Sequence, residues 1–374
     1  MNDIIAGGMM RGINDPQGFM FSYLSPEQRV PQNHPIRAIK GQADAVLKRM
    51  TRIFDRMYSK VGRPSIPPER LLKAQILIAL FSVRSDRQFC EMLDYNILFR
   101  WFLDMNMEEA SIDATTFTKN RDRLLEHKVA HRFFQAIVRR ARKAELLSEE
   151  HFSVDGTLIE AWASMKSFRP KEESEKDCPR TYDDPGNPTI NFRGEKRRND
   201  THQSTTDPEC RLMRKSNGQE AKLSYGAHAL RENRNGFLVD LTVSLAGNRA
   251  ERTEAVTMVK KLKQRDIPVK TVGADKGYDT KEFVKDMRIQ KITPHVAANI
   301  ERRGGSAIDG RTTRHEGYKV SQRIRKKIEE IFGWLKTVGG LRKSRFRGRA
   351  RTELQALLAG AAYNLMRMSR LIAA

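Results

Sequence analysis

Residues 151–162 read HFSVDGTLIEAW and mark a change in the texture of the chain. Phe152 and Val154 alternate with polar residues, as in a strand that has one apolar and one polar face. The polar face would carry Asp155, which Gly156 follows directly. An acid inside a strand is the first sign that this part of the chain builds a site as well as a core.

Strand and helix patterns alternate downstream of residue 222. LSYGAHALRE (223–232) and GFLVDLTVSLA (236–246) flank a turn of asparagines and glycine, which predicts an antiparallel hairpin. The elements expected next are a helix over 249–264, a strand that ends at Asp275, a helix over 280–287 and a strand over 291–296. Strands that alternate with helices after a hairpin predict a mixed-sheet α/β domain, which we expect to span residues 146–345. A C-terminal segment, 346–374, contains a last apolar helix that would cover this domain.

The chain upstream of the α/β domain reads as helical. After an N-terminal segment of residues 1–65, Pro67-Pro68 opens a helix whose apolar side chains recur at helical spacing, and helical patterns continue to about residue 145. Short helices that end in a polar, basic helix fit a helix-turn-helix module and a plain helical bundle equally well. On the first interpretation, the candidate DNA readers on this helix are Thr116, Lys119, Asn120 and Arg123.

Residues 163–222 interrupt the α/β pattern. They are rich in charged residues, serine and proline and poor in aliphatic residues, so we expect a mobile loop or an insertion that orders on its ligand. Cys178, His202 and Cys210 lie in this stretch, but their spacing matches no familiar zinc pattern.

Charge narrows the choice of partner. Lys and Arg number 69 against 46 Asp and Glu, a net charge of +23, which favours a polyanion such as nucleic acid. No apolar run approaches the roughly 20 residues of a transmembrane helix, so we expect no membrane partner. The three scattered cysteines suit a reducing cytoplasm. Charge alone does not predict an enzyme, because ribosomal and chromatin proteins are also basic.

Three acids stand out by their context. Asp155 lies in one predicted strand, Asp275 closes another, and Glu329 lies on a basic helix expected over 321–337. Each has a simpler explanation, because Asp-Gly is more often a turn signal and a Glu on a basic helix more often forms an ion pair.

The geometry of the late helix favours the functional explanation. At about 100° per residue, one face is an apolar ridge of Ile324, Ile328, Ile331 and Leu335. A different face would present Arg325, Glu329 and Lys336 together. A carboxylate between two cations fits a DNA backbone when a divalent metal binds the acid and the cations contact flanking phosphates.

With these residues in view, the chain resembles the DDE transposases of the insertion-sequence-five family. The resemblance rests on SYLSPEQRVPQNHPIRAI (22–39), GRPSIPPERLLKAQIL (62–77), LFSVRSDRQFCEMLDYNILFRWF (80–102), FTKNRDRLL (117–125), FSVDGTLIEAWAS (152–164), HALRENRNG (228–236), GADKGYDT (273–280) and RIRKKIEEIFGWLKTVGGLRKSRFRG (323–348). The family's third-acid motif is Tyr, two residues, Arg, three residues, Glu, six residues, Lys. Arg325, Glu329 and Lys336 match it, whereas Gln322 replaces the Tyr, which puts a contact of that Tyr to DNA or water in doubt.

The resemblance implies a ribonuclease H-like catalytic domain. In it, Asp155, Asp275 and Glu329 would bind two Mg²⁺ ions, with Mn²⁺ able to replace them, for hydrolysis at the element's end and transfer of that end to target DNA. It also implies double-stranded DNA with terminal inverted repeats as the partner, at least a homodimer on DNA, and a nucleoid location. The expected DNA contacts are Arg325, Lys336, Gln322, Arg323, Lys119, Asn120, Arg123, Arg345 and Arg347.

Two other functions remain open at this point. One is a metal-dependent nuclease that cuts without joining. The other is a catalytically silent DNA-binding regulator of transposase descent, against which the intact acids argue.

Overall fold

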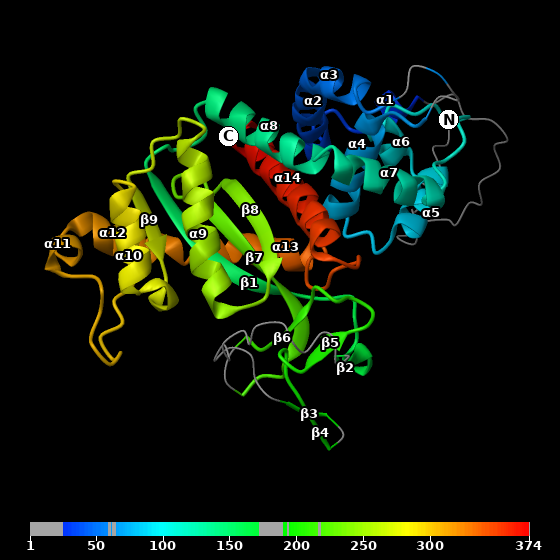
Figure 1. Ribbon diagram of the computed structural model, residues 1–374. Coiled ribbons are helices and arrows are strands. Elements are labelled where there is room, and N and C mark those ends of the chain that lie inside the picture. Colours follow the sequence, from blue (N-terminus) through cyan, green and yellow to red (C-terminus); the bar gives the residue numbers. More distant parts are fainter. Residues whose placement is uncertain are drawn as a thin grey trace, which may run out of the picture.

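The computed structural model describes residues 25–58, 61, 65–171, 190–192, 194–215 and 218–373. Residues 1–24 of the N-terminal segment, and residues 172–189 of the polar stretch, which include Cys178, lie outside these ranges. The described chain forms a helical part and a mixed-sheet part, with the long C-terminal helix between them (Figure 1).

The helical part contains the first eight α-helices. They are α1 (Pro26–Arg29), α2 (Pro35–Leu47), α3 (Thr51–Asp55), α4 (Pro68–Leu80), α5 (Asp86–Tyr95), α6 (Ile97–Phe102), α7 (Ala114–Glu126) and α8 (Val129–Lys143), with a 3₁₀ turn at Lys48–Met50. As predicted, a proline pair opens α4. The side chain of Asp113 caps α7 by accepting the N–H of Thr115.

The main sheet joins a meander to two parallel strands. Its strands are β1 (His151–Glu160), β6 (Arg211–Met213), β7 (Lys222–Glu232), β8 (Leu238–Leu245), β9 (Thr271–Ala274) and β10 (Thr293–Val296). β7 pairs antiparallel with β1, β6 and β8, while β9 pairs parallel with β1 and β10. The order β8-β7-β1-β9-β10 puts β1 in the middle, and the predicted hairpin is confirmed as β7 and β8.

Helices cover both faces of the sheet. α9 (Asn248–Lys263) packs on β7, β8 and β1, and α10 (Lys281–Ile289) packs on β10. A short 3₁₀ helix, η4 (Lys276–Tyr278), links β9 to α10. In Figure 1, α9 lies in front of the strands, while α12 (Glu316–Arg325) and α13 (Ile328–Thr337), preceded by α11 (Gly310–Thr313), run behind them.

The expectation of a single helix over 321–337 is wrong in one respect. The chain forms two helices, α12 and α13, separated at Lys326 and Lys327. The N–H groups of Lys327 and Glu329 reach back only three residues, to Ile324 and Lys326, so the turn tightens toward 3₁₀ geometry. The apolar ridge is otherwise present, since Ile328, Ile331 and Leu335 are buried and Ile324 is half-buried.

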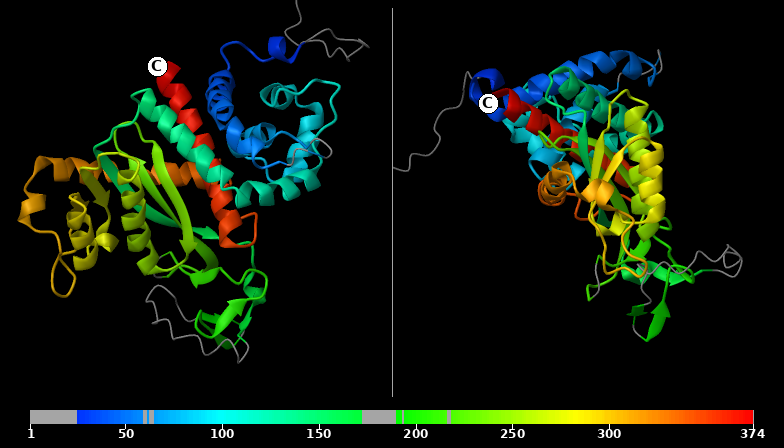
Figure 2. Two further views of the ribbon diagram at one scale, coloured as in Figure 1. Left: turned by 45° about the horizontal axis from the view of Figure 1, so that its top comes forward. Right: turned by 90° about the vertical axis from the view of Figure 1, so that its left-hand side faces the viewer.

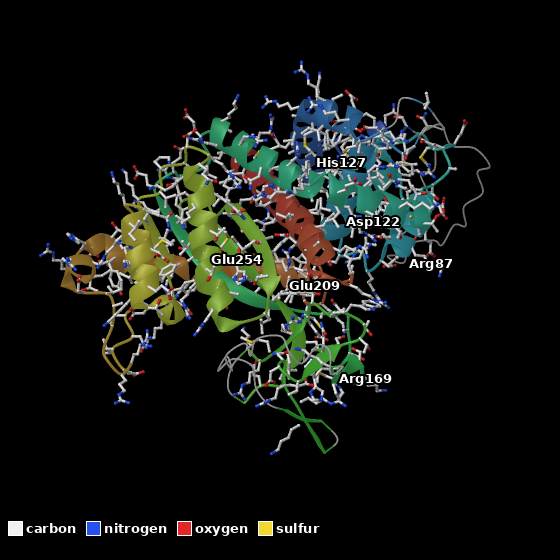
Figure 3. All side chains as sticks on the ribbon, in the orientation of Figure 1. Arg87, Asp122, His127, Arg169, Glu209 and Glu254 are labelled. Carbon is white, nitrogen blue, oxygen red and sulfur yellow. The ribbon has the colours of Figure 1, made fainter. Side chains whose placement is uncertain are left out.

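The polar stretch is more ordered than expected. β2 (Phe168–Pro170) pairs with β5 (His202–Ser204), β3 (Ile190–Phe192) pairs with β4 (Glu195–Arg197), and β6 extends the main sheet. The expectation of a mobile loop is wrong for residues 194–215, because Cys210 and Leu212 are buried. Figure 3 labels Glu209 near the start of the C-terminal helix α14 (Arg349–Ala373), where its carboxylate accepts the N–H of Arg349 at 2.8 Å.

The C-terminal helix is a shared core element rather than a simple cover. α14 (Arg349–Ala373) packs on β8 and also on α8, α4 and α2, so it joins the sheet to the helical part (Figure 2). The side chain of Asn364 bonds the backbone of Leu238 through both its oxygen and its nitrogen. Among the described residues, no helix is both long and apolar enough to cross a membrane.

Candidate active site

The first two acids, Asp155 and Asp275, lie where β1 extends beyond the end of β9. The parallel pairing of these strands ends at Ser153 and Gly273. Asp155 lies two residues beyond this pair and is held on its other side by pairing with Ala229 of β7. Asp275 follows the last residue of β9 directly. The two acids therefore lie at the same end of neighbouring strands.

The pKa of the Asp155 carboxylate is affected by burial and by the charges of the other predicted site residues. Its Oδ1 accepts the N–H of Gly156 at 2.8 Å. The pKa of Asp155 is raised to about 6, chiefly by burial; the charges of Asp275 and Glu329 act in the same direction, while the N–H of Gly156 and the charge of Arg325 oppose them. All three predicted acids and one predicted cation thus lie within electrostatic reach of one another.

The two acids in GADKGYDT have different roles. The half-buried Asp275 caps η4, where its side chain accepts the N–H of Gly277 at 2.9 Å. Asp279 is buried, and its carboxylate accepts the N–H groups of Asn299 and Ala307 at 2.7 and 2.9 Å. Asp275 therefore remains available for chemistry, while Asp279 fixes a loop.

A glycine lets α12 approach the sheet beside these acids. A Cβ at Gly273 would lie 3.1 Å from the Ser321 hydroxyl oxygen and 3.4 Å from Cβ of Arg325. Arg325 is held in turn by Gln322, whose side-chain oxygen accepts from Nε of Arg325 at 2.8 Å. Gln322 also donates to the carbonyl of His295. Here Gln322 orients Arg325, a role that the sequence did not reveal.

The third acid and the last cation come from α13. Glu329 is exposed and forms no ion pair within the part of the chain that the structure describes. Lys336 donates from Nζ to the Thr157 hydroxyl at 2.6 Å, two residues along β1 from Asp155. Burial, and then the charges of Lys215 and Arg342, lower the pKa of Lys336. This bond ties α13 to the strand that carries the first acid.

The donor set suits a hard divalent cation, but the side chains are not arranged as ligands. Carboxylate oxygens are what Mg²⁺ prefers. Within the described ranges, no three His, Cys, Asp or Glu side chains form a group that could hold a metal ion. Two of the three acids are oriented by backbone N–H groups, and Glu329 is exposed. Coordination by all three therefore requires side-chain rotation, most simply at Glu329.

The other residues expected to contact DNA divide into exposed and buried groups. Lys119, Arg323 and Arg347 are exposed. Asn120 is buried and donates to the carbonyl of Thr116, while its oxygen accepts from Arg123 at 3.2 Å.

The remaining two cations are half-buried. The guanidinium of Arg123 lies over the ring of Tyr58 at 4.5 Å. Arg345 lines a cavity of about 290 Å³ together with Thr118, Arg121, Asp122, Trp162, Phe346, Arg347 and Arg351.

Comparison with known families gives the class of the protein. A family model described as a transposase domain (DUF772) matches residues 24–123, which include the helices up to α7. A second model, described as a transposase DDE domain, matches residues 190–365. The chain therefore matches one transposase domain and one transposase DDE domain. The second match includes Asp275 and Glu329, whereas Asp155 lies upstream of it.

Solved structures give weaker similarities. The cryo-EM structure of a piggyBac transposase synaptic complex with hairpin DNA has a TM-score of 0.39 and 11% identity over 91% of this chain and 77% of that chain. The crystal structure of a pre-cleavage Mos1 transpososome has a TM-score of 0.20 and 10% identity over 84% and 81% of the two chains. Scores this low do not establish a common fold.

Proposed function

We propose that this protein is a DNA transposase that binds the terminal inverted repeats of a mobile element, cleaves its ends and transfers them to target DNA. The observation that carries the proposal is that Asp155 and Asp275 lie at the same end of β1 and β9, where the charges of Asp275, Glu329 and Arg325 all act on Asp155. The two transposase domain matches support it. The match of Arg325, Glu329 and Lys336 to the third-acid motif favours membership of the insertion-sequence-five family.

The sheet order also supports a ribonuclease H-like catalytic domain. Such a domain has a three-stranded meander whose first strand is parallel to a fourth, and β1, β7, β8 and β9 follow this pattern. It would carry its acids on the first strand, after the fourth strand and on a late helix, where Asp155, Asp275 and Glu329 lie.

Each residue of the site then has a role. Asp155, Asp275 and Glu329 would hold two divalent cations, which supply activation of a water or a DNA 3′-hydroxyl and stabilise the leaving oxygen. Arg325 and Lys336 flank the acids and would contact the phosphates on either side of the cleaved bond. Gln322 keeps Arg325 over the sheet. Mg²⁺ is the expected cation, with Mn²⁺ as its substitute.

The excess of positive charge supports DNA as the partner. Joining two ends requires at least a dimer on DNA, and such a substrate would place the protein at the nucleoid. Of the residues expected to contact DNA, we retain the accessible Lys119, Arg323 and Arg347 together with the two cations of the site. Asn120 is dropped because its side chain is buried.

The test is an assay for cleavage and joining on labelled DNA that carries the element's ends, with Mg²⁺ or Mn²⁺. Asp155→Asn, Asp275→Asn and Glu329→Gln should each reduce cleavage by several orders of magnitude while repeat binding in a gel-shift assay persists. The matched control is Glu330→Gln, an exposed neighbour that should cleave normally.

Three outcomes would contradict parts of the proposal. Full cleavage by one of the three acid variants would remove that acid from the site. Cleavage without joined products would favour a nuclease. Repeat binding without cleavage under any metal would favour a silent regulator.

A further inference from the structure

A cavity of about 290 Å³ lies where the helical part of the molecule meets the mixed-sheet part. One wall comes from α7 and includes Arg121 and Asp122, the second of which Figure 3 labels. The other walls come from Trp162, just after β1, and from residues 345–351, which we call the basic segment. The cavity therefore contacts both parts of the molecule, and the candidate active site does not use it.

Backbone contacts bring the basic segment to the end of β1. The N–H of Glu160 donates to the carbonyl of Arg342 at 3.1 Å, and the N–H of Ser344 donates to the carbonyl of Glu160 at 2.7 Å. The chain just before the basic segment thus runs parallel to the last residue of β1. The side chains that follow, Arg345 on one segment and Trp162 on the other, line the same cavity.

Two of the four arginines that line the cavity already have a carboxylate partner. The guanidinium of Arg121 pairs with Asp86 and lies over the ring of Phe346 at 4.0 Å. Arg351 donates to Asp122 from two nitrogens, at 2.8 and 3.1 Å. These contacts join α7 to the basic segment, so the two arginines fix the walls of the cavity rather than provide free charge.

The other two arginines, Arg345 and Arg347, have no counter-ion. Neither guanidinium forms an ion pair or a hydrogen bond within the part of the chain that the structure describes. Arg347 is exposed, whereas Arg345 is half-buried. Burial lowers the pKa of Arg345, and the charge of Asp86 opposes this effect. Because burying an unpaired charge costs free energy, an anion that enters the cavity would bind favourably.

A glycine in the turn before the basic segment makes room for the Arg345 side chain. Gly340 has a φ of +69°, and a Cβ there would lie 2.7 Å from a terminal nitrogen of Arg345. A simpler explanation is therefore that Arg345 only packs against this turn. On that explanation the charge of Arg345 affects stability but not DNA binding, so the two explanations can be distinguished.

Trp162 provides an apolar wall beside the unpaired arginines. Its side chain is 51% exposed, although tryptophan is one of the side chains that gains most from burial. An aromatic ring next to guanidinium groups suits a nucleotide, because the phosphate bonds to the guanidinium groups while the deoxyribose packs on the ring. Inorganic phosphate would use the arginines but not the ring.

We infer that this cavity binds one backbone phosphate of the element's terminal DNA, with the phosphate on Arg345 and Arg347 and its deoxyribose against Trp162. This rests on the proposed function, because the DNA is that of the element's ends. Trp162 follows Asp155 by seven residues, roughly 20 Å along an extended chain. The bound phosphate is then about six base pairs from the cleaved bond, at about 3.4 Å per base pair. Its contact aligns DNA held by the helical part with the candidate active site.

Duplexes that carry the element's end, each with one phosphate replaced by an uncharged methylphosphonate, test this contact with the full-length protein. At one position, at the predicted distance from the cleaved bond, replacement should weaken binding on the order of 10-fold. Arg345→Gln should weaken binding of the natural duplex by a similar factor. This variant should also be insensitive to replacement at that position, though not at others, because both changes remove the same contact.

The matched control is Arg87→Gln, which removes an exposed arginine from α5, outside the cavity (Figure 3). It should leave the sensitivity at the identified position unchanged. Arg347→Gln changes an exposed side chain and should reduce this sensitivity without affecting folding. Trp162→Ala should weaken binding roughly 2- to 10-fold, whereas Trp162→Phe, which keeps an aromatic ring, should bind nearly as well as the unmodified protein.

Several results would overturn the inference. One is a scan with no position whose effect disappears in Arg345→Gln, and another is such a position at the cleaved bond itself. Loss of the effect in Arg87→Gln as well would point to total charge. Lower stability of Arg345→Gln in urea, with unchanged DNA binding, would assign Arg345 to the Gly340 turn alone.

The scan measures binding and not cleavage, so its failure is distinct from failure of the proposed function. The expected pattern in a protein that cleaves no DNA under any metal would support the cavity as a phosphate site and contradict the proposed cleavage. Normal cleavage and joining, with no position that depends on Arg345, would contradict the cavity alone.

Discussion

At the scale of single residues, Asp155 contributes to the site at the expense of stability. A carboxyl whose folded-state pKa is about 6 binds a proton more tightly in the folded than in the unfolded chain. The folded state is therefore favoured at low pH, and this contribution is lost as the pH rises from about 4 to about 6. At neutral pH, the half-buried charge weakens the metal-free fold.

Asp155→Asn should therefore stabilise the metal-free protein at pH 7.5. We expect a gain on the order of 1–2 kcal/mol, less than the full shift implies because the group is only half-buried. Below about pH 4 the gain should disappear, because the native carboxyl is then protonated. Urea unfolding in EDTA across this pH range measures the difference. A constant gain at every pH would show that burial of the charge is not its cause.

At the scale of elements, two acids of one short segment have different roles. Asp275 belongs to the candidate site, whereas Asp279 holds a loop in place. Asp279 accepts two N–H groups and the hydroxyl of Ser306, at 2.6 Å, so it holds the loop over 297–309 against η4. An asparagine at position 279 would place its NH₂ group, itself a donor, against these donors, so at least one hydrogen bond would be lost. Hydrogen bonds to charged groups typically contribute about 1.5–3 kcal/mol.

Asp279→Asn should lower the free energy of unfolding by about 2–3 kcal/mol and make the 297–309 loop sensitive to protease. Asp275→Asn should do neither. Urea unfolding and limited proteolysis of both variants provide the comparison. If the two variants lost equal stability, the division of roles between these acids would be wrong.

Elements with strong periodicity were predictable from the sequence, and long-range contacts were not. The hairpin of β7 and β8 and the positions of β1 and β9 followed from local patterns, and α4 began at the predicted proline pair. The order of residues 194–215 was missed because their few apolar side chains are buried against β7. Local composition does not report such a partner.

The same limit applies to the candidate site. Three acids and two cations stood out because each had a local context. Gln322 acts through Arg325 and His295, a set of contacts that exists only in the folded chain. Asn120 was predicted to contact DNA because it is a polar residue on a polar helix, but its side chain is buried. In both cases, packing in the folded chain decided the role of the side chain.

At the scale of the whole molecule, the net charge of +23 makes DNA binding strongly dependent on salt. Each neutralised phosphate contributes about 0.9 to the slope of log K against log salt on duplex DNA. Arg323 is exposed on α12 and forms no ion pair in the described part of the chain. Arg323→Ala should therefore reduce the slope by about 1 if this residue contacts a phosphate.

Lys319 provides a matched control on the same helix, one turn before Arg323. Its ammonium already pairs with Glu316 at 3.2 Å, so Lys319→Ala should leave the slope nearly unchanged. Fluorescence anisotropy on one DNA duplex at several salt concentrations measures both variants. Equal slopes for Arg323→Ala and the unmodified protein would remove Arg323 from the DNA surface. Equal reductions in both variants would mean that binding depends on total charge rather than on particular phosphate contacts, and the proposed contact of Arg323 with a phosphate would then be wrong.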